Sequence, residues 1–129
     1  MGEAERKGNQ EFKAELKRRL YRFVLGVVDL IDSLKNDNVS KRLADQLLRS
    51  STSIIANFVE GQAGSSKKDF VKYMEISLKS ANESKLWLSL LKDTHRASPE
   101  KADAFLKEGN EIANIFGAIV LTAKGKRHS

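Results

Sequence analysis

Apolar residues along the first third of the chain recur at alternating steps of three and four residues, from about Gln10 to Lys35. This spacing places them on one face of a helix and predicts a single long amphipathic helix. The residues that make up its apolar face are Phe12, Leu16, Leu20, Phe23, Val24, Val27, Leu30, Ile31 and Leu34.

Three further helices are predicted by the same periodicity and by the residues that interrupt it. Asn36 to Asn38 supply a turn and a cap, and a second helix is expected over about residues 39–60, ending at Gly61. Gly61 to Ser65 are expected to form a loop, after which Ser66 and Asp69 resemble a capping box that starts a third helix. That helix is expected to end near Thr94 and His95, and Ser98-Pro99-Glu100 is a strong start signal for a fourth, which Gly125 closes.

Loops this short make consecutive helices antiparallel neighbours, so the predicted fold is all-α, an antiparallel up-down-up-down four-helix bundle. The length of 129 residues is that of one domain. We expect residues 1–9 to be a flexible N-terminal segment, residues 10–124 to form the bundle, and residues 125–129 to be a basic C-terminal tail. Leu47, Phe70, Leu88 and Phe116 are predicted core residues.

The residue types that catalysis or metal binding would need are scarce. The chain has no cysteine and only two histidines, His95 and His128, and neither has a partner at a metal-ligand spacing. No histidine lies where it could serve as base for the many serines, and the Glu-x-x-His pairs of di-iron bundles are missing. We therefore expect no catalytic residue, no metal, no cofactor and no enzymatic activity.

The segments that would direct the chain to a membrane are also missing from the sequence. No apolar stretch reaches the roughly 20 residues of a membrane span, and residues 1–10 do not contain the apolar core of a secretory signal. We expect a cytoplasmic protein with no membrane partner.

Small polar residues recur at helical spacing in the second and third helices, at Ser50, Ser53 and Asn57 and again at Ser77, Ala81 and Ser84. Such residues let two helix backbones approach closely and bond to carbonyls one turn back. Tight helix packing is the simpler interpretation. A ligand pocket is the alternative.

The positive charge is unevenly distributed. The net charge is +6, and the predicted topology collects about +7 at the end where the first and third helices start and the second and fourth finish. A basic cluster of this kind can bind phosphates, whereas its simpler role is to keep the surface solvated. The candidate nucleic-acid-binding residues are Lys13, Lys17, Arg18, Arg19, Arg22, Lys67, Lys68, Lys72, Lys124, Lys126 and Arg127.

Three segments of the second and third helices resemble a known family. Residues 53–61 (SIIANFVEG) are similar to the S-I-x-A-N-x-x-E-G signature of the small bacterial four helix bundle proteins, and residues 66–70 and 80–88 resemble the pattern of their third helix. This family includes the proteins encoded in intervening sequences of large-subunit ribosomal RNA genes. It is related to the accessory variability determinant of diversity-generating retroelements.

The resemblance implies a homopentamer and, on the retroelement branch, a basic surface that binds structured RNA and a reverse transcriptase. Apolar residues outside the seam of the third helix also point to a homo-oligomer, namely Tyr73, Ile76, Leu78, Leu86 and Trp87. Our leading hypothesis is a non-enzymatic scaffold or adaptor associated with RNA or DNA, accessory to a reverse transcriptase on that branch. The alternative is a purely protein-binding scaffold.

Overall fold

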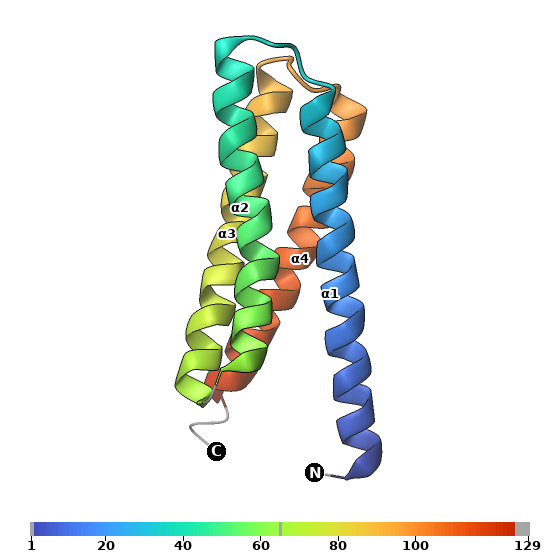
Figure 1. The fold of residues 1–129 in the computed structure, drawn as a ribbon, viewed down its shortest axis with the longest axis vertical. Coiled ribbons are helices and arrows are strands. Elements are labelled where there is room, and N and C mark those ends of the chain that lie inside the picture. The colour runs from blue at the N-terminus through green and yellow to red at the C-terminus, as the bar shows by residue number, and fades with distance from the viewer. Residues whose placement is uncertain (1, 65, 126–129) are drawn as a thin grey trace.

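The computed structural model of the chain, which describes residues 2–64 and 66–125, consists of four long helices. They are α1 (Glu3–Asp32), α2 (Asn38–Ala63), α3 (Lys67–Asp93) and α4 (Pro99–Gly125). Successive helices run in opposite directions, and the described residues contain no strand (Figure 1). The predicted up-down-up-down bundle is confirmed. No helix within the described residues is long and apolar enough to cross a membrane.

The helix starts are set by short polar side chains. Asp37 accepts a hydrogen bond from the backbone N–H of Ser40 at 2.9 Å, and Ser66 accepts one from the N–H of Asp69 at 3.1 Å. Each bond satisfies one of the N–H groups that the first turn of a helix leaves without a partner. Pro99 occupies the first position of α4, where its missing N–H costs nothing.

Two predicted boundaries are wrong. α1 starts at Glu3 and not at about Gln10, so the part of residues 1–9 that the structure describes is largely helical, with exposed side chains. Gly61 lies inside α2 and is buried. A Cβ atom at this position would come within 2.5 Å of the Met74 Cε atom of α3. The glycine predicted to end the helix is instead a position where α3 packs closely against the backbone of α2. Of the predicted tail, residues 126–129 lie outside the described residues.

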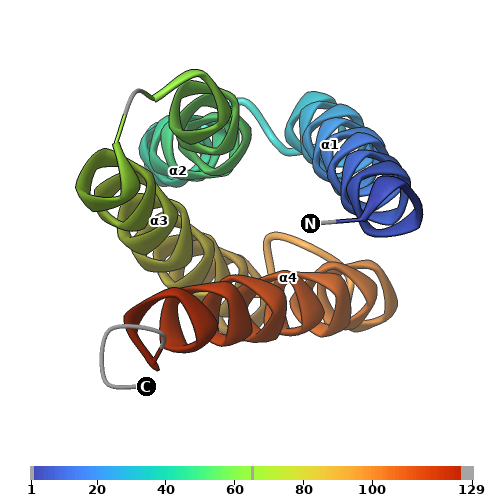
Figure 2. The same cartoon turned by 90° about the horizontal axis from the view of Figure 1, so that it is seen from below.

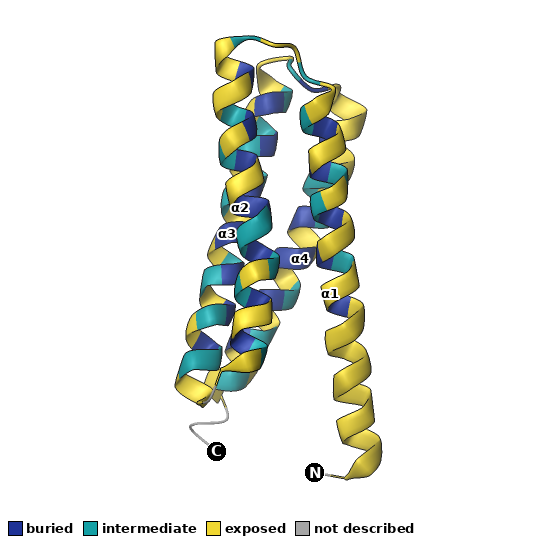
Figure 3. Cartoon of the chain, viewed as in Figure 1, coloured by how far each residue is buried: buried dark blue, intermediate teal, exposed yellow. Residues whose placement is uncertain are grey.

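The core runs along the inner faces of all four helices (Figure 3). Leu47, Leu88 and Phe116 are fully buried, as predicted. Phe70 is only half-buried, because it lies near the start of α3, where α1 does not cover it closely. The predicted core is therefore correct at three of its four positions.

Serine hydroxyls join α2 to α3. Ser50 and Ser84 share a hydrogen bond of 2.7 Å, and Ser80 donates to the Ser53 hydroxyl at 2.8 Å. Ser77 donates to the backbone carbonyl of Ile54 at 2.8 Å, which is a direct side-chain bond from one helix to the backbone of the next. These hydroxyls are used for helix packing, and α2 and α3 form the most extensive helix pair of the bundle.

α1 is the least embedded helix. It packs against α2 less extensively than the other neighbours pack together, and its contact with α4 is the smallest in the bundle. Seen from below, the starting end of α1 and the final end of α4 diverge to different sides (Figure 2). As a result every described α1 residue before Leu16 is exposed.

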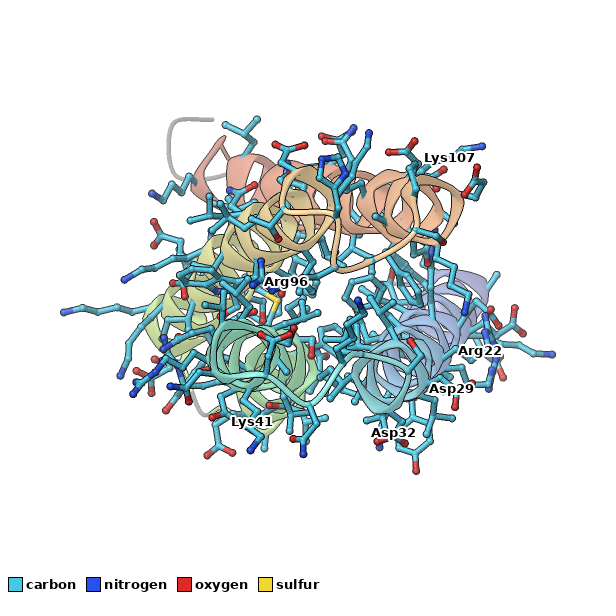
Figure 4. The ribbon with its side chains drawn as sticks, turned by 90° about the horizontal axis from the view of Figure 1, so that it is seen from above. Arg22, Asp29, Asp32, Lys41, Arg96 and Lys107 are labelled. Atoms are coloured by element: carbon cyan, nitrogen blue, oxygen red, sulfur yellow. The ribbon has the colours of Figure 1, made fainter. Side chains whose placement is uncertain are left out.

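The opposite end of the bundle is held by Arg96 in the loop between α3 and α4. Its Nε atom lies 3.5 Å from Oδ1 of Asp37, the cap of α2, so this contact joins the two loops at that end. Viewed from above, Arg96 lies near the middle of the bundle, whereas Lys41 and Lys107 lie at its outside (Figure 4). Hydrogen bonds from Ser40 and the charge of Arg96 lower the pKa of the Asp37 carboxyl.

Candidate nucleic-acid interface

The start of α1, the end of α2, the start of α3 and the end of α4 lie at the same end of the bundle (Figure 1). We call this end, comprising residues 3–17, 55–63, 67–75 and 117–125, the lower end. The topology thus brings together the helix ends that carry most of the candidate basic residues. Their individual environments, however, differ.

Arg19 is engaged in a bidentate ion pair with α4. Its Nε and Nη2 atoms each lie 2.7 Å from a carboxylate oxygen of Glu108, and Nη2 lies 3.3 Å from Glu111. The hydrogen bonds that Arg19 donates to Glu108 lower the pKa of the Glu108 carboxyl and raise the pKa of the Arg19 guanidinium. Arg19 is only 30% exposed and lies above the lower end, so its charge connects α1 to α4 rather than being presented to a ligand.

Arg18 and Arg22 share one carboxylate on their own helix. Nη2 of Arg18 lies 2.9 Å from Glu15, and Nη2 of Arg22 lies 3.4 Å from the other oxygen of the same group. Hydrogen bonds from Arg18 and then Arg22 lower the pKa of Glu15. All three side chains are about 60% exposed, and exposed pairs of this kind contribute little to stability. Arg18, Arg22 and Glu15 together therefore carry a net charge of +1, whereas the two arginines alone would carry +2.

Two candidates on α3 and α4 also have partners. Lys124 lies 3.0 Å from a Glu75 oxygen, which is an ion pair between the two helices. The Lys72 ammonium lies 5.0 Å from the centre of the Tyr73 ring, a cation–π distance. The charge of Lys124 is offset by the Glu75 carboxylate, whereas Lys72 has no acidic partner among the described residues and retains its full charge.

Besides Lys72, four of the candidate lysines at the lower end have no ion pair with any described residue. Lys13 and Lys17 lie one turn apart on α1, and Lys67 and Lys68 begin α3. All four side chains are exposed. Lys126 and Arg127 lie outside the described residues. The structure therefore reduces the eleven predicted residues to a smaller set of lysines whose charge is uncompensated.

Sequence reasoning missed an apolar groove beside these lysines. Phe12 of α1, Phe70 of α3 and Ile119 of α4 line two adjoining hollows of about 440 and 130 Å³. Phe12 is 44% exposed although it continues the apolar seam of its helix. The only available signal was that an apolar seam extended to the start of α1 without a counterpart of equal length on α4.

No group of three or more histidine, cysteine or carboxylate side chains that could hold a metal is found among residues 2–64 and 66–125. The Ser40 hydroxyl donates to the Asp37 carboxylate, and the other buried serines of α2 and α3 are bonded to other serines or to backbone carbonyls. The part of the chain that the structure describes thus offers charge and apolar surface for binding.

The chain is similar to a known protein family and to a solved structure. The model of the family described as 23S rRNA-intervening sequence protein matches residues 9–118. A crystal structure described as a protein of unknown function from the S23 ribosomal protein family of Bacteroides thetaiotaomicron is 32% identical, with a TM-score of 0.76 over 81% of this chain and 97% of that one. No match is found among curated proteins.

Proposed function

The chain belongs to the 23S rRNA-intervening sequence protein family, and from this membership and its uncompensated lysines we propose that it is a non-enzymatic RNA-binding adaptor. The membership agrees with the family resemblance noted in the sequence. The observation that carries the proposal is the placement of Lys13, Lys17, Lys67 and Lys68 at one end of the bundle without acidic partners among the described residues. Such lysines attract phosphates and release counterions when they bind.

The experiment is an electrophoretic mobility shift with a structured RNA hairpin at two salt concentrations. Replacing Lys17, Lys67 and Lys68 together by Gln should weaken binding at low salt. It should also reduce the slope of log K against log salt by about 2 to 3, because each lost phosphate contact removes about 0.7 to 0.9.

The matched control replaces Lys41, Lys101 and Lys107 by Gln. These lysines are exposed, have no ion pair among the described residues, and lie on the upper half of the bundle, two of them labelled in Figure 4. Both triple variants change the net charge equally, so nonspecific attraction is the same in the two. Equal losses of binding, or no binding by the wild type even at low salt, would contradict the proposal.

We extend the proposal to a homo-oligomer, with five subunits and a reverse transcriptase partner on the retroelement branch. What supports the number five and the reverse transcriptase is only the family resemblance of residues 53–61, 66–70 and 80–88. The apolar surface that supports an oligomer is smaller than the sequence suggested, because Tyr73, Leu78 and Trp87 pack partly against the core. Leu86 remains 52% exposed and lines a groove of about 500 Å³ between α3 and α4, and Leu121 of α4 remains 73% exposed. Sedimentation of a monomer at micromolar concentration would contradict this part.

The second candidate is a scaffold that binds only proteins, and the same exposed leucines favour it. In that function the lysines serve solubility alone. Wild-type protein that binds no RNA at low salt but forms an oligomer lost in Leu121→Lys would favour this candidate over the first.

A further inference from the structure

The apolar groove at the lower end is formed by residues from every helix of the bundle. Its larger hollow, of about 440 Å³, lies between α1 and α4 with Phe70 at its side. Its smaller hollow, of about 130 Å³, reaches inward to Phe58 and Met74. The two share Phe12, Phe70 and Ile119, so they form one continuous concave surface.

The groove exists because α1 diverges from α4. The ion pair from Arg19 to Glu108 and the edge-to-face contact of Phe23 with Phe105, 6.1 Å between ring centres, connect the two helices above it. Below that level no ion pair or ring contact connects them in the described part of the chain. Two phenylalanine rings consequently remain partly exposed, although solvent-exposed apolar patches are normally kept small.

The charge that lines the groove is positive. Among the described residues, Lys13 is the only charged side chain that lines either hollow, and no carboxylate lines them. Lys17 follows Lys13 by one turn of α1, and Lys67 precedes Phe70 by about one turn of α3. The groove thus combines partly exposed aromatic rings with uncompensated positive charges.

We propose that this groove receives an unpaired base of the bound RNA, which stacks against Phe12 and Phe70 while Lys13 contacts its phosphate. The inference rests on the proposed RNA-binding function. Proteins that bind single strands combine basic grooves with aromatic side chains, since every base has a flat face that stacks. Unpaired loops and bulges are also where proteins most readily reach RNA bases.

Size and charge favour a base over the other occupants of an apolar groove. A volume of about 440 Å³ falls within the range of roughly 300 to 1,000 Å³ for clefts that hold small organic groups. A second copy placed with its own lower end in the groove would bring the same lysines together, and like charges oppose such contact. A nucleotide instead supplies an apolar ring face and a negative charge next to each other.

The test compares two RNAs of equal length, a blunt duplex and a hairpin whose unpaired loop contains 2-aminopurine. In Phe12→Leu the groove keeps an apolar side chain but loses a ring, and the position is exposed enough for the protein to fold. We expect this variant to bind the hairpin roughly tenfold more weakly, as the loss of one base–aromatic stack predicts, and to bind the duplex as the wild type does. The 2-aminopurine fluorescence should change on binding to the wild type and change less with the variant.

The matched control is Tyr21→Leu, which removes an aromatic ring that is 59% exposed on the same helix but does not line the groove. We expect it to bind both RNAs as the wild type does.

Equal affinity of the wild type for both RNAs, together with no effect of Phe12→Leu, would overturn the base-binding groove while leaving RNA binding by the lysines intact. A change in the sedimentation coefficient of Phe12→Leu without RNA would show that a second copy fills the groove, which also overturns it. Failure of the wild type to bind either RNA at low salt would overturn the proposed function, and this inference with it.

Discussion

Phe116 is the residue whose truncation tests the packing of the bundle most directly. Its side chain is fully buried, and its ring lies 5.9 Å from that of Phe58 at an interplanar angle of 76°. Phe116→Ala removes the buried ring and leaves a cavity, changes that together cost about 3 to 5 kcal/mol. Part of this, about 0.5 to 1.5 kcal/mol, is the lost edge-to-face contact with Phe58.

Two other phenylalanines provide a graded control. Phe12 is 44% exposed and Phe70 is half-buried, so their truncation to Ala should cost less, with Phe12→Ala losing about 1 kcal/mol and Phe70→Ala an intermediate amount. Urea unfolding followed by circular dichroism, at one fixed protein concentration, gives the three free energies. A loss below about 1 kcal/mol for Phe116→Ala, or the reverse order of the three, would show that the inner face of α4 is wrongly assigned.

Two glycines and one ion pair give further tests of stability. Gly61→Ala places a methyl group 2.5 Å from the movable end of Met74 and 3.1 Å from Tyr73 Cβ, which can move only with α3, and it should destabilise the fold by about 1 kcal/mol in thermal or urea unfolding. Gly117→Ala has no neighbour within 4 Å of the new Cβ atom and should stabilise α4 by up to about 1 kcal/mol, so equal signs for the two would contradict the packing. Glu108→Gln should cost about 0.5 to 1 kcal/mol at pH 7 by weakening the pair with Arg19. Because the pKa of Glu108 is lowered in the fold, the wild type should lose this advantage as the pH falls from 4.5 through the lowered value, and the unfolding free energies of the two proteins should converge there.

The periodicity of the sequence was sufficient for the number, order and direction of the helices, because short capped loops leave one arrangement of neighbours. The caps Asp37 and Ser66 lie within the start signals that the sequence predicts, and Pro99 is the first residue of α4, also as predicted. Gly61 was misinterpreted because a glycine that ends a helix and a glycine that lets two helices touch look alike in a sequence. Only the position of Met74 on the neighbouring helix distinguishes them.

The candidate interface could be predicted as a region but not residue by residue. Topology alone placed the basic helix ends together. Ion pairing depends on side-chain positions across helices, and the sequence separation of 89 residues between Arg19 and Glu108 gives no sign of their contact. The groove depends on the divergence of α1 from α4, which is a property of crossing angles that hydrophobic periodicity does not encode.

The ion pairs lead to a quantitative expectation for RNA binding. Suppose an RNA short enough to contact one lower end is bound only by Lys13, Lys17, Lys67 and Lys68. The slope of log K against log salt should then be about −3 to −4, since each neutralised phosphate contributes about 0.7 to 0.9. If all eleven predicted residues contacted phosphate, the slope would be about −8 to −10. In a cyclic ring every lower end faces the same side, so longer RNAs should give steeper slopes by engaging further subunits. A slope near −8 with the short RNA would mean that Arg18, Arg19, Arg22 and Lys124 exchange their carboxylate partners for phosphates and that Lys72, Lys126 and Arg127 also contact phosphate, so that the four lysines are not the whole interface.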